Sequence, residues 1–248
     1  MPVLRSFAGS GLREAACGLL LVVVLLCLAA PGTASDTAPP GPAEVLVRLT
    51  RSYERIERYR TETEVTEFRE GHVAETKRFR YSFSRPDRIH IEMIAPHPGT
   101  TLDYPAGDGK VAVSPGGWAG FLTFHLATGS SLLRTDAGQR IDQTGMGMLI
   151  ANIARSLTGK RRGEIAEKME NGLLQLEVLS DDHFLPGIRT RYRFTIDTQR
   201  WLPVEVREFT PDGVPRRTVR FLDMQTTPRA PVDGVPLQEK DRSDAQHR

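Results

Sequence analysis

Hydrophobic residues along this chain follow two different periods, and the change between them predicts the order of its elements. From Val45 to Ile56, apolar residues recur every three or four positions, which is the spacing of one helix face. From Thr61 onward the period becomes two, as in a strand that buries one face. The pattern therefore predicts one helix followed by a series of strands.

Alternating residues also predict that the first strands share one apolar face. A turn at Gly71 separates two runs, and a break at residues 85–87 precedes a third. The apolar members of the second and third runs are Phe79, Tyr81, Phe83, Ile89, Ile91 and Met93. We expect these side chains to lie on one side of an antiparallel sheet.

The second half of the chain repeats this arrangement after a second helix. Residues 145–157 have apolar positions at helical spacing, and Gly159 can end the helix. Asn171-Gly172 is the strongest two-residue hairpin signal in the sequence. The later alternating strands contribute apolar residues expected on the same face: Tyr192, Phe194, Val204, Val206, Val219 and Phe221. The chain thus has roughly nine or ten strands joined by hairpins, with one helix before them and one in the middle. This order predicts an α+β, mostly β fold, in which a curved antiparallel sheet is covered on its concave face.

The N-terminal residues have the composition of a secretory signal. Arg5 and Arg13 precede an apolar core at residues 19–28, and residues 31–34 offer small side chains for cleavage. This core is short for a bilayer span, although an uncleaved anchor is an alternative. We expect a signal at 1–34, a Pro-rich linker at 35–42, one domain at 43–225 and a polar, disordered tail at 226–248. The expected location is the periplasm, after secretion across the inner membrane.

Composition argues against several classes of function. Cys17 and Cys27 both lie in the signal, so the mature chain has no thiol for catalysis, disulfides or metal binding. Charges nearly balance, with 33 Lys+Arg and 31 Asp+Glu, so no strong field attracts nucleic acid. The sequence has no Gly-x-Ser-x-Gly elbow, phosphate-binding loop or His-Glu-x-x-His motif. We expect no enzymatic activity, cofactor or nucleic-acid partner; a hydrolase would have to depend on His90 or His183.

Two charged features have alternative explanations. Residues 181–183, Asp-Asp-His, form the best metal candidate, but a metal site needs further ligands, so we expect no metal. Arginine rows at Arg78/Arg80 and at Arg189/Arg191/Arg193 have the chemistry to meet anionic headgroups. Outward strand faces balanced by Asp and Glu explain them better.

Two segments resemble the LolA/LolB-like periplasmic lipoprotein carriers. Residues 83–92, followed by Gly107-Asp108-Gly109-Lys110, are similar to the family's strand, basic residue with proline, strand, and Asp-Gly-Lys pattern. Residues 194–206 are similar to its later strands, with four residues between Ile196-Asp197 and Leu202-Pro203, and so is the turn at Asp212-Gly213. The middle of the chain resembles an uncharacterised secreted bacterial branch of this superfamily.

The resemblance implies an unclosed β-barrel with helices over an apolar cavity. It also implies binding of a lipid or of an acylated protein, without catalysis. The alternative is an interaction module that senses envelope lipids and holds an inner- or outer-membrane protein, as the LolA-like domain of a sigma-factor regulator does.

The cavity and a mobile lid form the candidate binding site. Residues 118–133 indicate a binding loop because aromatic residues stand beside glycines, and methionines of the second helix can adapt to irregular ligands. A packed core is the alternative for any single residue. The candidate ligand-binding residues are Phe79, Tyr81, Phe83, Ile89, Ile91, Met93, Trp118, Phe121, Phe124, Met146, Met148 and Ile153.

Overall fold

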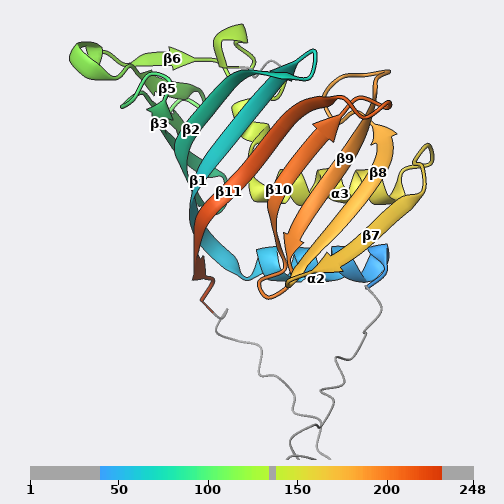
Figure 1. The fold of residues 1–248 in the computed structure, drawn as a ribbon. Helices are drawn as coiled ribbons and strands as arrows, with labels where there is room; N and C mark the ends of the chain where they lie inside the picture. The colour runs from blue at the N-terminus through green and yellow to red at the C-terminus, as the bar shows by residue number, and fades with distance from the viewer. Residues whose placement is uncertain (1–39, 134–137, 231–248) are drawn as a thin grey trace, which may run out of the picture. The chain divides into compact units, whose positions relative to one another are not determined.

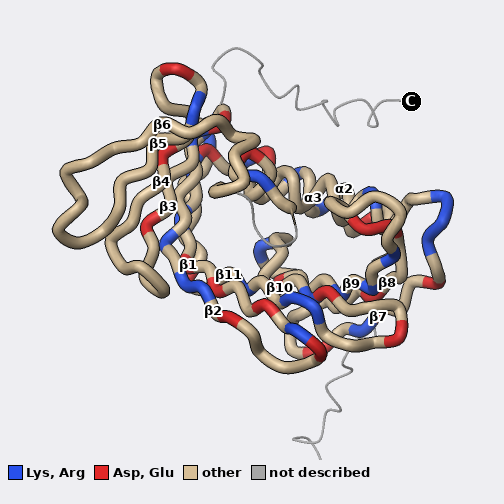
Figure 2. Tube along the Cα trace, turned by 90° about the horizontal axis from the view of Figure 1, so that it is seen from above, with Lys and Arg blue, Asp and Glu red and all other residues tan. Residues whose placement is uncertain are grey.

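One antiparallel sheet forms most of the computed structural model, which describes residues 40–133 and 138–230 (Figure 1). Within these residues the sheet has eleven strands in the order β6-β5-β4-β3-β2-β1-β11-β10-β9-β8-β7. Two helices lie on the inside of its curve (Figure 2). The edges β6 and β7 do not pair with each other, so the sheet curves without closing. The predicted fold class is confirmed.

The elements follow the predicted order. The helices are α2 (Pro42–Glu54) and α3 (Met146–Thr158), and short 3-10 turns occupy Gly117–Ala119, Ser131–Leu133 and Ile141–Gln143. The strands are β1 (Ile56–Arg69), β2 (His72–Ser84), β3 (Arg88–Ala95), β4 (Thr101–Tyr104), β5 (Val111–Ser114), β6 (Phe124–Leu126), β7 (Ile165–Glu170), β8 (Leu173–Asp181), β9 (Arg189–Asp197), β10 (Leu202–Phe209) and β11 (Pro215–Pro228). β6 was expected to be loop, because three residues are too few to show an alternating pattern.

The first and last strands are neighbours in the middle of the sheet. β1 pairs with β2 on one side and with β11 on the other, so the N- and C-terminal parts of the domain share one sheet. Ile56, predicted to be helical, is the first residue of β1 and pairs with Pro228. That prediction was wrong because a buried residue at the helix-to-strand boundary fits both periods.

α2 and α3 pack against each other on the concave side (Figure 2). Val45 and Leu49 of α2 are fully buried, as the helical spacing predicted. Gly147 of α3 allows the close approach, because a Cβ there would lie 2.8 Å from Cε1 of Tyr53. The first turn of α3 is further fixed by its Met146 N–H, which donates to the Tyr59 hydroxyl at 2.9 Å.

The last strand continues slightly beyond the expected domain end. β11 extends to Pro228, and the Arg229 N–H donates to the Arg55 carbonyl at 2.7 Å. The expected signal and most of the expected linker and tail lie outside the described residues. In the part of the chain that is described, no helix has the length and apolar character needed to cross a membrane.

Candidate functional site

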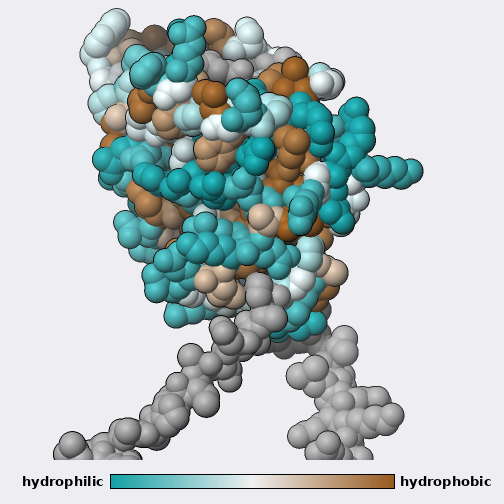
Figure 3. Space-filling view, turned by 45° about the vertical axis from the view of Figure 1, so that its right-hand side comes forward, coloured by the Kyte–Doolittle hydropathy of each residue, from teal (hydrophilic) through white to brown (hydrophobic). Residues whose placement is uncertain are grey.

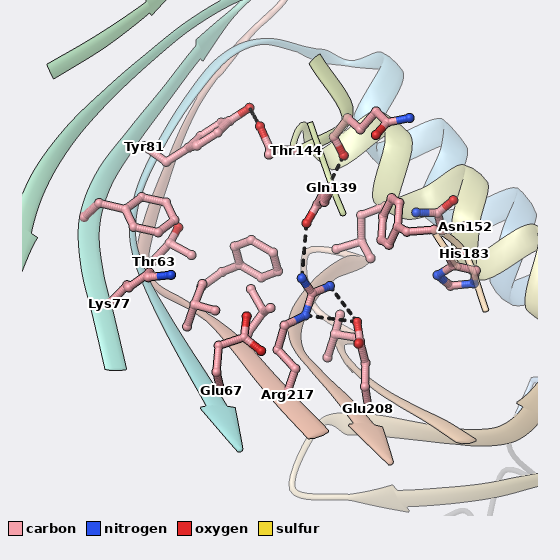
Figure 4. A pocket seen from close by; sticks show the side chains of 18 of the residues that line it. Thr63, Glu67, Lys77, Tyr81, Gln139, Thr144, Asn152, His183, Glu208 and Arg217 are labelled. Atoms are coloured by element: carbon pink, nitrogen blue, oxygen red, sulfur yellow. Dashed lines mark hydrogen bonds and ion pairs between the residues drawn. The ribbon is translucent and has the colours of Figure 1, made fainter. Parts of the chain in front are cut away.

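A cavity of about 140 Å³ lies between the concave face of the sheet and α3 (Figure 4). β1, β2, β10 and β11 supply one wall. Leu149 and Asn152 of α3, the segment 139–144 and the loop at 183–184 supply the other. The cavity therefore lies where the hydrophobic core does not completely fill the curved sheet.

Strand register arranges the cavity wall in three rows across the sheet. Directly opposed residues share a face, so their side chains enter the same space. The inner row is Phe79, Thr63 and Phe221; the middle row is Lys77, Val65, Val219 and Val206; and the outer row is Glu67, Arg217 and Glu208. We call the outer row the charged row. It lies toward the sheet end that carries the β1–β2 and β10–β11 turns, away from α2 (Figure 1).

Arg217 is a buried charge at the border of this cavity. Its Nε and Nη2 donate to Oε1 of Glu208 at 3.2 and 2.6 Å, and its Nη1 donates to Oε1 of Gln139 at 3.4 Å (Figure 4). Both side chains of the Arg217–Glu208 pair are 7% exposed. Burial lowers the pKa of Arg217, but Glu208 and Glu67 more than offset this, so the pKa is raised and the guanidinium remains charged.

Tyrosines form the opposite, uncharged part of the wall. The rings of Tyr59 and Tyr81 stack with centroids 5.7 Å apart, and the Tyr81 hydroxyl lies 3.4 Å from Oγ1 of Thr144. Burial raises the pKa of Tyr81 to about 12, which keeps the phenol neutral.

Two buried threonines on β1 differ in how their hydroxyls are satisfied. Thr61 donates to the Leu222 carbonyl at 2.7 Å. Thr63 faces the cavity, is 4% exposed, and its Oγ1 has no hydrogen-bond partner among the described residues. Such an orphaned hydroxyl costs free energy unless something in the cavity bonds to it.

His183 contributes a neutral ring to the cavity wall. The ring stacks on Tyr192 with centroids 4.1 Å apart, and Nε2 lies 2.8 Å from the Ser156 hydroxyl. Burial, helped by Arg155, lowers the His183 pKa to about 4, against the opposing effect of Asp182. The imidazole is therefore uncharged at neutral pH.

The Ser156–His183 contact does not have the geometry of a catalytic pair. Ser156 is 1% exposed, and its hydroxyl also contacts the Ser180 hydroxyl at 3.0 Å. The neighbouring Asp182 accepts hydrogen bonds from the N–H groups of Phe184 and Leu185 and from the Thr190 hydroxyl. An inaccessible hydroxyl beside a weakly basic imidazole is unsuited to nucleophilic attack.

The two aspartates of the metal candidate at residues 181–183 also pair with arginines. Asp181 pairs with Arg161, and Asp182 also pairs with Arg216 at 3.3 Å. Across residues 40–133 and 138–230, no group of three or more His, Cys, Asp or Glu side chains is arranged to hold a metal ion.

The structure places the predicted site residues in three different environments. Phe79 and Tyr81 line the cavity. Phe83, Ile89, Ile91, Met146 and Ile153 are buried in the hydrophobic core, while Met93 and Met148 are half-buried outside the cavity lining. The same strand face thus contributes to both core and cavity, at different depths.

Trp118, Phe121 and Phe124 lie at the surface. We expected a closed lid to cover them, but Trp118 is 88% and Phe121 77% exposed. They belong to a segment near β5 and β6 whose exposed large side chains we call the aromatic edge: Trp118, Phe121, Leu122, Phe124 and Leu132. β6 is an edge strand of the sheet, so among the described residues no strand covers its outer side.

Sequence reasoning missed the polar side chains of the cavity. Glu208 lies two residues from Val206, and Arg217 two residues from Val219, so both share the inward alternation of those valines. The same parity places Glu67 in line with Val65 and Thr63. This alternation was the available signal, but a charge was not expected on the buried face.

The arginine rows lie on the convex face, as expected. Arg80 pairs with Glu92 at 3.0 Å, and Arg193 pairs with Glu177 at 2.7 Å. Arg78 pairs with Glu62. Figure 3 shows hydrophobic side chains scattered among hydrophilic ones on the face that it presents. The ion pairs show that the arginine rows belong to an outer surface on which positive and negative charges are balanced.

No protein-family model and no curated protein matches this sequence. Among similar solved structures is an uncharacterized conserved protein from Thermus thermophilus: TM-score 0.44, 9% identity, covering 77% of this chain and 94% of that one. Another is the Pseudomonas aeruginosa MucA/MucB complex, with a TM-score of 0.39 and 12% identity, covering 77% of this chain and 59% of that one. This chain therefore spans about three fifths of that protein. A third is the LolA superfamily protein NE2245 from Nitrosomonas europaea, with a TM-score of 0.32 and 10% identity, covering 76% of this chain and 94% of that one.

A LolA superfamily protein is thus among the similar solved structures. TM-scores at this level carry no argument about function, which has to come from this chain's own residues.

The two buried threonines provide a matched test of the cavity. We expect Thr63→Val to raise the free energy of unfolding of the ligand-free protein by about 1 kcal/mol, because it removes an unsatisfied hydroxyl. Thr61→Val should lower it by about 1 kcal/mol, because it breaks the bond to Leu222. Denaturant unfolding measures both; equal destabilisation by the two variants would contradict this description of the cavity.

His183 should make stability depend on pH. Its pKa falls from an ordinary value of 6.5 to about 4 on folding, so between these values the unfolded chain binds more protons. We expect the free energy of unfolding to decrease as pH falls from 6.5 towards 4. In His183→Gln this part of the slope should be absent, whereas His72→Gln, at an exposed position, should retain it. Identical slopes in wild type and His183→Gln would show that the ring is not buried in the neutral form.

Proposed function

We propose that this domain binds a hydrophobic ligand, a lipid or an acylated protein, in the cavity under α3 and carries it without chemical conversion. The observation that supports this most directly is the apolar cavity that remains between a curved sheet and a packed helix. Burial of acyl chain would supply about 0.8 kcal/mol per methylene. The composition of residues 1–34 supports secretion, so we place this activity in the periplasm.

The cavity volume limits what the present conformation can hold. An apolar cavity of about 150 Å³ accommodates a group the size of benzene, whereas drug-sized ligands need roughly 300–1,000 Å³. At about 140 Å³, this cavity accepts the end of a chain. A longer chain requires α3 and the segment 139–144 to move away from the sheet. The Thr63 hydroxyl would then provide a hydrogen-bonding point inside a largely apolar cavity.

A cavity-filling substitution tests this proposal. In Val219→Phe the added ring should occupy the middle row and displace about two methylenes of ligand, which corresponds to about 1.6 kcal/mol and about tenfold in affinity. We would measure lipids by mass spectrometry after extraction from protein purified from the envelope, and dodecanol affinity by titration.

The matched control is Leu222→Phe, which places the same ring on the opposite face of β11. It should retain the ligand and the wild-type affinity. If Val219→Phe binds as well as Leu222→Phe, the cavity is not the binding site.

The aromatic edge favours a second candidate function, an interaction module that holds a membrane-protein partner. Trp118 is 88% exposed and Leu132 81% exposed, within 15 residues of each other. Aromatic side chains of this kind are enriched at protein interfaces, and exposed clusters of them mark interaction sites.

Substitution of the edge separates the two functions. Trp118→Ser with Phe121→Ser should leave the melting temperature unchanged, because both side chains are in solvent. We expect a stoichiometric membrane protein to co-purify from solubilised envelopes with the wild type and with Val219→Phe, but not with the doubly substituted protein. Equal recovery with all three proteins would rule out the edge as the contact surface.

A further inference from the structure

A second, polar cavity adjoins the apolar one at the charged row. It has a volume of about 230 Å³ and is lined by Arg69, Arg216 and Ala74 together with the charged row and Phe68. Glu67, Glu208 and Arg217 line both cavities. The charged row is therefore the boundary between an apolar space and a polar one.

We propose that the ligand of this domain is an anionic amphiphile, whose headgroup binds Arg217 at this boundary and whose chain enters the apolar cavity. This inference rests on the proposed function, because it assumes that a hydrophobic chain is bound there. It adds the chemical class of the headgroup and the residue that recognises it.

The hydrogen bonds of Arg217 show where an anion would bind. Glu208 uses one edge of the guanidinium, through Nε and Nη2, with its Oε1 atom. On the other side, the bond that Nη1 makes within the described part of the chain is a long one, 3.4 Å to the neutral amide oxygen of Gln139 (Figure 4). A carboxylate or phosphate oxygen would replace this bond with a shorter, charge-assisted one, and the planar guanidinium suits both groups.

The cations around the boundary differ in whether a carboxylate outside the cavity lining already pairs with them. Lys77 pairs with Glu75 at 3.0 Å, and Arg216 pairs with Asp182 at 3.3 Å. Arg69 forms no ion pair with a described side chain, but it is exposed at the end of β1, where solvent and salt screen its charge. The buried guanidinium of Arg217 is therefore the group that would attract an anionic headgroup and repel a cationic one.

Stability alone is a poor explanation for the Arg217–Glu208 pair. Desolvation of two charges offsets most of their attraction, so apolar replacements of such pairs are often as stable or more stable. The charged row lies about 13 Å along the strand from Thr63, at roughly 3.3 Å per residue. The part of the cavity between Thr63 and the charged row can therefore hold a chain segment. Charge at one end of an apolar space is the arrangement that an amphiphile requires.

The test compares ligands that share one chain and differ only in the headgroup. Dodecanoate, dodecyl phosphate, dodecanol and dodecyltrimethylammonium are titrated into the full-length mature protein at neutral pH below their micelle concentrations. We expect the two anions to bind about tenfold tighter than dodecanol, as one charge-assisted hydrogen bond provides. Dodecyltrimethylammonium should bind most weakly, and the better anion identifies carboxylate or phosphate as the preferred headgroup.

Three variants assign this preference to Arg217. The charge-neutral double variant Arg217→Gln/Glu208→Gln avoids leaving an unpaired buried charge and should bind all four ligands with the affinity that wild type has for dodecanol. Glu208→Gln keeps an acceptor for Arg217 while removing the competing charge, so it should strengthen anion binding. Arg220→Gln, an arginine on the convex face of the same strand, should behave like wild type.

Failure of this inference is distinguishable from failure of the proposed function. If dodecanol binds as tightly as the anions, or if the double variant keeps their preference, the cavity binds hydrophobic chains and the headgroup assignment is wrong. If none of the four ligands binds the wild type, the proposed function itself is overturned.

Discussion

The pairing of β1 with β11 is the constraint on which the rest of this structure depends. It joins the start and the end of the domain in the middle of the sheet and sets Thr63 opposite Phe221, Val65 opposite Val219 and Glu67 opposite Arg217. Because side chains alternate between faces, a shift of one residue would turn Val219 and Phe221 outward and bring Thr218 and Arg220 inward. The cavity and its charged boundary thus exist only in one register.

Local parts of the fold were predictable because local signals specify them. The apolar spacing around Val45 and Leu49, and the Asn171-Gly172 turn, each depend on residues close in sequence. Sheet order was less accessible, since the partner of β1 lies about 160 residues away along the chain. Alternation marked Phe79, Tyr81 and Phe83 as one face, but only the packing of Tyr53 and Tyr59 against Phe83 decides that this residue belongs to the core.

The polar half of the site was harder to predict for a related reason. Arg216 and Arg217 are adjacent, so one of them has to face inward, and the turn at 211–214 obscures which one. Only the register with Glu208 and Glu67 resolves this. The aromatic edge shows the opposite problem: its composition suggested burial, whereas its position beside a short edge strand leaves the side chains in solvent.

In the proposed binding mode, headgroup binding helps the chain of the ligand to enter the cavity. The segment from Gln139 to Thr144 leads directly into α3, and Gln139 accepts its bond from the same Nη1 group that would bind the headgroup. α3 itself is held at its start by Tyr59 and near its end by the contacts of Ser156. An anion at Arg217 would displace Gln139 without disturbing either of these anchors. The segment before α3 would then be released first, beside the inner and middle rows where a longer chain needs additional room. A neutral ligand has no charged group that competes with Gln139 for Arg217. It would therefore have to open the same segment with the free energy of chain burial alone.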